Sequence, residues 1–149
     1  MTGDAVNRAI VVERMLPHPP EKIWRVLTES ELIGRWAMPN NFRAEIGHRF
    51  TFRTKPMGDW DGVIACQVLA CDPARLLRYS WVGGAENNDK YGSRLDSVVT
   101  WTLTPKDGGT LLRMEHDGFG PGNAFAYEAM SGGWARLLDR IGELSAELN

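Results

Sequence analysis

Residues 97–148 read SVVTWTLTPKDGGTLLRMEHDGFGPGNAFAYEAMSGGWARLLDRIGELSAEL. Residues 97–104 and 110–117 alternate apolar and polar side chains, and KDGG at 106–109 separates them, which is typical of a β-hairpin. From residue 123 the apolar spacing changes to i, i+3, i+4, i+7, which predicts a long amphipathic helix over 123–148. This stretch therefore predicts an antiparallel sheet with one long helix packed on it.

The residues before this stretch predict further strands and two short helices. Pro19 and Pro20 suit a helix start, and Ser30 can cap a second short helix over 31–36. Strands are expected at 8–16, 42–46, 48–53, 62–71 and 76–82, with Gly47 as a hairpin turn and 83–94 as a mobile hairpin loop. The order predicts an α+β fold, in which a curved antiparallel sheet of about six or seven strands wraps around the C-terminal helix.

Length and composition limit the class of protein. The chain has 149 residues, which suits a single domain over residues 1–149, and its formal net charge is −2. A phosphate backbone requires a basic face, so we expect no nucleic-acid partner. The sequence contains no apolar run of about 18 residues, so we expect no membrane span.

The two cysteines bear on the compartment. Cys66 and Cys71 lie in one strand-like run. Five residues of strand span about 16 Å, whereas a disulfide needs Cα atoms within about 7 Å. We therefore expect two free thiols, which suits a reducing, cytoplasmic compartment. The sequence has no CxxC pair, which argues against a structural zinc site. We expect no metal site, and we expect no cofactor.

Six short motifs occur in a fixed order along almost the whole chain. They are PPEKIWRVL at 19–27, LIGRW at 32–36, GHRF at 47–50, DPARL at 72–76 followed by Trp81, GTLLRMEHDGF at 109–119 and GWARLL at 133–138. In this order they resemble the motifs of the family named after the activator of heat-shock-protein-90 ATPase, in its short bacterial single-domain form. His48 and Ala74 depart from the family pattern, which has glycine and proline at those positions.

This family resemblance places the chain in the START and birch-pollen-allergen (SRPBCC) superfamily. It implies a START-like helix-grip fold with a cavity between the concave sheet face and the long helix. The superfamily includes lipid binders, cyclases and co-chaperones, so the fold alone does not assign a function.

Six tryptophans either build an unusually aromatic core or line a hollow one. We expect a void on the order of 300 Å³ or more between Phe52, Trp81, Trp101, His116 and Trp134. A filled core is the alternative, because any sheet and helix must bury such stripes. The side chains expected to line a ligand-binding cavity are Phe50, Phe52, Tyr79, Trp81, Trp101, Met114, His116, Trp134 and Leu138.

His116 is the most informative polar side chain in this set. The alternation of its strand points it inward, where it either serves a ligand as a polar anchor or acid–base group, or is satisfied by a backbone carbonyl. His48, with Tyr79 near it, is a second candidate. Glu115 and Asp117 flank His116 but point to the opposite face, so we expect no catalytic residues.

Three functions from different classes fit these residues. The first is a protein that holds a small hydrophobic molecule in the cavity without chemistry. The second is a chaperone-linked stress-response protein, as the family resemblance implies. The third is a cyclase- or hydrolase-type enzyme that acts in the cavity and requires a polar pair with shifted pKa values. An exposed edge strand would also allow a homodimer.

Overall fold

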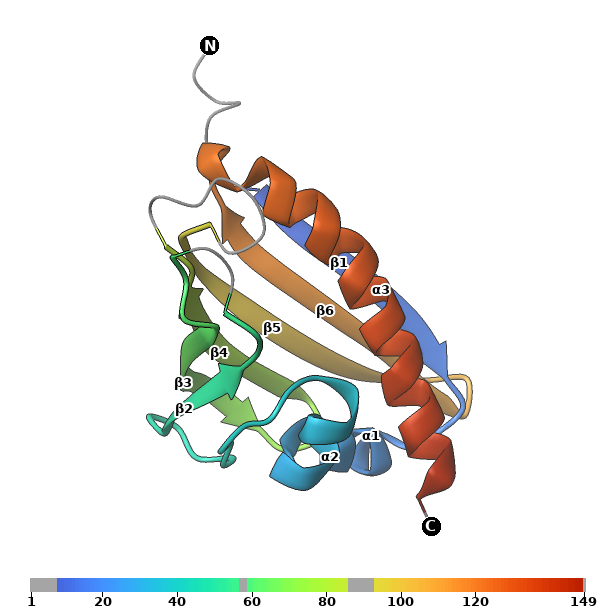
Figure 1. Ribbon diagram of the computed structural model, residues 1–149. Helices are drawn as coiled ribbons and strands as arrows, with labels where there is room; N and C mark the ends of the chain where they lie inside the picture. Colours follow the sequence, from blue (N-terminus) through green and yellow to red (C-terminus); the bar gives the residue numbers. More distant parts are fainter. Residues whose placement is uncertain (1–7, 57–58, 86–92, 149) are drawn as a thin grey trace.

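The structure, a computed structural model, describes residues 8–56, 59–85 and 93–148 (Figure 1). Most of the predicted mobile loop 83–94 therefore lies outside the described residues. The elements are β1 (Arg8–Leu16), α1 (Pro20–Thr28), α2 (Ser30–Trp36), β2 (Arg49–Arg53), β3 (Val63–Asp72), β4 (Leu76–Gly83), β5 (Leu95–Lys106), β6 (Gly109–Phe119), the short 3-10 helix η2 (Pro121–Asn123) and α3 (Ala124–Glu147).

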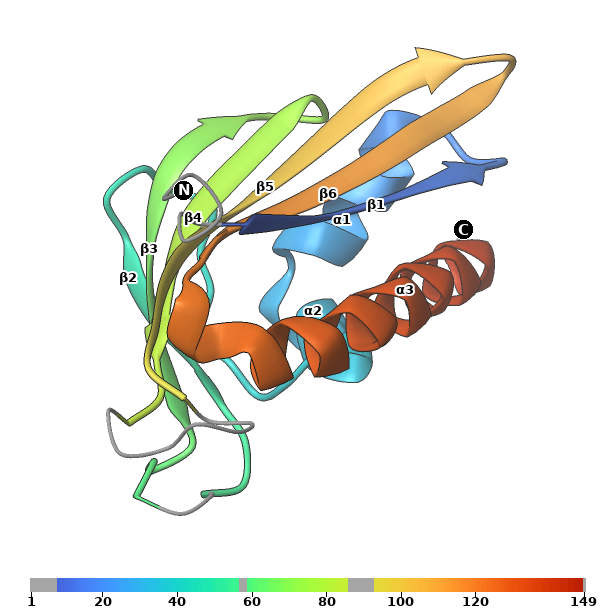
Figure 2. The same ribbon diagram turned by 90° about the horizontal axis from the view of Figure 1, so that it is seen from above.

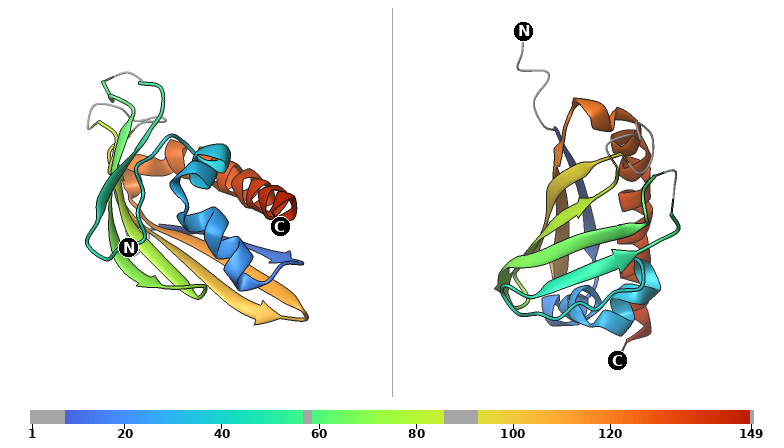
Figure 3. Two further views of the ribbon diagram at one scale, coloured as in Figure 1. Left: turned by 90° about the horizontal axis from the view of Figure 1, so that it is seen from below. Right: turned by 60° about the vertical axis from the view of Figure 1, so that its left-hand side comes forward.

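The strands form one six-stranded antiparallel sheet in the order β1-β6-β5-β4-β3-β2. Figure 2 shows that the sheet is curved and that α1, α2 and α3 all lie on its concave side. The two views in Figure 3 show the same arrangement from below and from the side of β2 and β3. The predicted helix-grip fold is confirmed, including the long C-terminal helix and the two short helices after the first strand.

Two periodicities meet in the core. Along β5 every second residue points toward α3, so Val99 and Trp101 are fully buried. Along α3 the helical period brings Trp134, Leu138 and Ile141 to the opposing face, where each is at most 3% exposed. The alternation in the sheet and the helical stripe therefore bury each other, which is why the helix lies in the hollow of the sheet.

The strand predicted over 42–46 is absent from the described structure, so the sheet has six strands. Phe42 is buried, but Ile46 is 70% exposed. The neighbouring asparagines replace strand pairing with side-chain hydrogen bonds, because the Thr51 N–H donates to Asn41 Oδ1 at 2.8 Å. This segment crosses the open edge of β2 as an irregular chain. The alternating apolar residues of this segment therefore mark one buried side chain, Phe42, and not a strand.

Gly118 creates a bulge in β6. Asp117 pairs with Ala9 and Phe119 pairs with Arg8, so Gly118 has no partner in β1. Its φ is +122°, and a Cβ at this position would lie 2.9 Å from the Cα of Ser97. Only glycine fits this conformation without strain. The bulge ends the strand just before the chain turns into α3.

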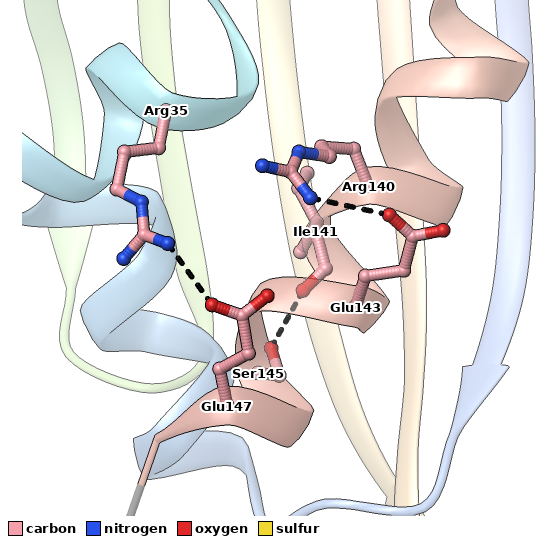
Figure 4. A network of polar contacts seen from close by, with 6 residues as sticks. All are labelled: Arg35, Arg140, Ile141, Glu143, Ser145 and Glu147. Atoms are coloured by element: carbon pink, nitrogen blue, oxygen red, sulfur yellow. Dashed lines mark hydrogen bonds and ion pairs between the residues drawn. The ribbon is translucent and has the colours of Figure 1, made fainter.

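Ion pairs attach α3 to its neighbours on both sides. Glu147 of α3 pairs with Arg35 of α2 at 2.9 Å, while Arg140 and Glu143 pair with each other within α3 at 3.3 Å (Figure 4). On the other side, Arg14 of β1 pairs with Asp139 of α3 at 2.8 Å. Within the part of the chain that is described, no helix is long and apolar enough to cross a membrane.

Candidate functional site: an aromatic cluster and the groove beside it

The five side chains expected to surround a void form a packed cluster instead. The rings of Phe52 and Trp81 have centroids 5.4 Å apart, and those of Trp81 and His116 are 5.1 Å apart. Trp134 lies 5.7 Å from each of Trp81, Trp101 and His116. These are contact distances for aromatic rings. The expectation of a cavity between these five side chains is therefore wrong, because rings from four strands and α3 fill that space.

A chain of hydrogen bonds runs through the cluster. The indole Nε1–H of Trp134 donates to Nδ1 of His116 at 3.0 Å, and Nε2 of His116 lies 2.8 Å from the Ser97 hydroxyl. The Ser97 hydroxyl donates to the carbonyl of Trp81 at 2.8 Å. An indole can only donate, so Nδ1 of His116 accepts and the proton resides on Nε2. The geometry therefore specifies a neutral imidazole in the Nε2–H form.

His116 is sealed from solvent by these partners. Its side chain is fully buried, and this burial lowers its pKa from 6.5 to about 3. Both ring nitrogens are occupied by protein groups, so His116 has no free atom for a ligand or a proton transfer. The structure replaces the expected backbone partner with two side chains, Ser97 and Trp134.

The remaining side chains predicted to line a cavity pack behind the cluster. The Tyr79 hydroxyl accepts a hydrogen bond from Trp101 Nε1 at 3.0 Å, and burial raises the Tyr79 pKa. The Phe50 ring lies 5.3 Å from the ring of Tyr79. Met114 and Leu138 are both fully buried. In this structure these residues belong to the core rather than to an open surface.

His48 lies apart from His116 and from the Tyr79 hydroxyl. Its Nε2 is 3.0 Å from the carbonyl of Asn41, and its ring stacks on Phe50. The three polar candidates therefore have separate partners and do not form a catalytic pair. Across the described ranges, no three His, Cys, Asp or Glu side chains gather in a way that could hold a metal ion.

Open space lies directly beside the aromatic cluster. A groove of about 280 Å³ runs between α3 and the sheet, and Trp81 and Trp134 form part of its wall. A smaller hollow of about 30 Å³ shares Trp81 and Met130 with this groove. The groove is lined by Met38, Trp81, Ala129, Met130, Gly133, Trp134, Arg136 and Leu137. Of the predicted lining residues, the structure brings only Trp81 and Trp134 to this groove.

Gly133 gives the groove its depth on the helix side. A Cβ at Gly133 would meet no heavy atom within 4 Å, so packing does not require glycine here. A glycine inside a helix costs about 1 kcal/mol relative to alanine. The adjacent Gly132 and Gly133 are therefore the sequence signal that could have located the groove, because a helix interior rarely contains such a pair without a reason.

Asn123 fixes the start of α3 next to this space. Its side-chain Nδ2 donates to Ser93 Oγ at 3.0 Å and to the Arg94 carbonyl at 2.7 Å. Its Oδ1 accepts from the Gly120 N–H at 2.9 Å. These bonds join the entry to the helix with the chain that leads into β5. The helix wall of the groove is thereby held against the sheet.

The fold and these motifs define a helix-grip domain. Residues 17–146 match the family described as Activator of Hsp90 ATPase homolog 1-like protein, and the chain belongs to this family. No curated protein matches the sequence.

Several solved structures share the fold over nearly the whole chain. Protein MLL2253 from Mesorhizobium loti is 42% identical, with a TM-score of 0.84, and the match covers 95% of this chain and 99% of that one. BH1534 from Bacillus halodurans is 25% identical with a TM-score of 0.73, covering 94% of this chain and 99% of that one. CalU16 from Micromonospora echinospora is 24% identical with a TM-score of 0.68, covering 95% and 85% respectively. The last similarity concerns the fold alone.

Proposed function

We propose that this protein binds a small hydrophobic molecule, without chemistry, in the groove between α3 and the sheet. The observation that carries the proposal is the open volume of about 280 Å³ whose lining includes Trp81 and Trp134. Ligand sites in proteins typically start near 300 Å³ and are lined mainly by apolar and aromatic side chains. Seven of the eight lining residues carry no charge, which matches that composition.

The glycine at position 133 supports the same proposal. Glycine is unfavourable inside a helix, yet no heavy atom lies within 4 Å of the place that a Cβ on Gly133 would occupy. The space next to Gly133 therefore stays open. A ligand that fills the groove would use this space. The aromatic cluster behind it forms a rigid floor, because its rings and its buried polar groups are already satisfied.

Membership of the family also suggests interaction with a chaperone. Of the large apolar side chains exposed among the described residues, Val11 and Met15 share a strand, and the other three lie on or beside three other elements, so the set favours no single extended docking surface. They are Val11 and Met15 on β1, Ile46 before β2, Leu69 on β3 and Phe125 on α3. The groove is thus the better supported site. The free thiols of Cys66 and Cys71 support a reducing compartment such as the cytoplasm for this activity.

The test uses the neutral fluorophore phenylnaphthylamine and the quenching of tryptophan emission. We expect saturable binding to the native protein and quenching, because Trp81 and Trp134 line the site. Gly133→Leu places a larger side chain into the groove while improving the helix propensity. We expect this variant to weaken binding by about tenfold or more.

Ala124→Leu is the matched control. Ala124 is exposed on the same helix and does not line the groove, so the added leucine should leave binding unchanged. The proposal is overturned if the native protein shows no saturable binding. It is also overturned if Gly133→Leu and Ala124→Leu bind the fluorophore equally well.

A further inference from the structure

Arg136 is the one charged residue that lines the groove. Nearby arginines are already paired: Arg14 with an aspartate of α3, and Arg35 and Arg140 with glutamates of α3. Arg136 makes no ion pair and donates no side-chain hydrogen bond to any of the described residues. An exposed guanidinium at the edge of an apolar groove is therefore available to an anion.

The path of this side chain is also defined. Its Nη1 lies 3.5 Å from the place that a Cβ on Gly132 would occupy, so the guanidinium folds back along the helix. The two adjacent glycines thus have different effects. Gly133 leaves the groove open, whereas a Cβ at Gly132 would only reach ordinary contact with the guanidinium.

We infer that the groove takes an amphiphile with one carboxylate, whose apolar part contacts Trp81 and Trp134 and whose carboxylate is bound by Arg136. This inference rests on the proposed function, since it names the class of ligand for the same groove. A guanidinium presents a planar fork that matches a carboxylate with two parallel hydrogen bonds. No acidic side chain lines the groove to compete for it.

The charge at the groove favours a monoanion. One cation can neutralise one carboxylate, whereas a phosphate monoester would keep unpaired charge beside the apolar wall. The smaller hollow beyond Met130 continues the apolar surface past Trp81. Met130 is an unbranched and adaptable side chain, so an extended apolar tail can displace it. A short fatty acid has this combination of one carboxylate and a linear tail.

The experiment compares decanoate with decanol, which share the same tail, in displacing phenylnaphthylamine near neutral pH. A carboxylate is ionised there. We expect decanoate to bind native protein about two- to fivefold more tightly than decanol, and Arg136→Gln to remove this advantage. Decanol affinity should stay the same in Arg136→Gln. Raising the salt concentration should weaken decanoate binding alone, because salt screens an exposed ion pair.

Arg140→Gln is the matched control, since Arg140 lies one turn along the same helix and does not line the groove. It should retain the preference for decanoate. The inference is overturned if both ligands bind equally well, or if Arg136→Gln keeps the preference. If neither ligand displaces the fluorophore, the groove itself is not a binding site and the proposed function fails with it.

Discussion

Replacing His116 by glutamine should remove a large part of the pH dependence of folding stability between about pH 7 and pH 5. In the folded protein the imidazole is buried and neutral, and its pKa is lowered from 6.5 to about 3. In the unfolded chain it titrates near 6.5. Glutamine can still accept from the Trp134 indole and donate to Ser97. It does not titrate, so the variant isolates the contribution of the imidazole.

The sign follows from proton binding in the two states. Well above pH 6.5 His116 is neutral whether the chain is folded or unfolded, so it adds no dependence on pH there. As the pH falls below 6.5, the unfolded chain binds a proton that the folded chain rejects, which favours unfolding. The slope approaches about 1.4 kcal/mol per pH unit and continues until the pH nears the folded pKa. At about pH 5 the native protein should have lost about 2 kcal/mol through this group.

Urea unfolding of both proteins at about pH 7, 6 and 5 measures this difference. The free energy of unfolding of the native protein should fall by about 2 kcal/mol more than that of His116→Gln. The other ionisable groups are common to both proteins and cancel. Equal losses in the two proteins would refute the reasoning, because they would mean that the folded state also accepts the proton.

A spectroscopic measurement covers the case in which His116→Gln does not fold. Nitrogen NMR of the imidazole in the native protein should show the Nε2–H form, with Nδ1 as the acceptor for Trp134. This form should persist to about pH 5. Titration of His116 near its ordinary pKa would contradict the sealed geometry.

Four substitutions test the packing by urea unfolding. Gly133→Ala should stabilise the protein by about 0.5–1 kcal/mol, since its Cβ meets nothing within 4 Å; a loss of stability would show that the space is not open. Gly118→Ala should instead cost about 1–3 kcal/mol, because φ is +122° and the Cβ would approach Ser97; a neutral result would argue against the bulge. Asn123→Ala should cost about 1–3 kcal/mol by leaving partly buried backbone groups without partners, and a cost near zero would mean that water replaces them. Trp134→Ala should cost about 3–5 kcal/mol, whereas a loss below about 1 kcal/mol would place the indole outside the core.

Sequence periodicity was sufficient for most of the fold. The alternation in 97–104 and 110–117 and the helical stripe after residue 123 each depend on neighbours that are close in the chain. The prediction of a strand over 42–46 was wrong, because alternating apolar and polar residues do not distinguish a strand from a loop with one buried phenylalanine. The hydrogen bonds of Asn41 that stabilise this loop involve His48 and Thr51, which are seven and ten positions away.

The site was less predictable for a different reason. Periodicity showed that Trp81, Trp101 and His116 point toward the helix, but it does not give the distance between rings on neighbouring strands. Whether such rings touch or leave a void depends on the register between the strands and on how closely α3 packs against the sheet. The free guanidinium of Arg136 was equally hidden. Arg136 stands out only once the structure shows which acidic residues the other arginines use. Asp139, for example, pairs with Arg14, which is far away in the sequence.

The indole N–H signals of the tryptophans test most directly whether the groove is the binding site. In a nitrogen–proton correlation spectrum, saturation with decanol should shift the indole signals of Trp81 and Trp134, which line the groove. The signal of Trp24, on α1 and outside the groove, should stay in place. Unchanged signals for Trp81 and Trp134 at saturation, or a larger shift for Trp24, would contradict the proposal that the groove binds the apolar ligand.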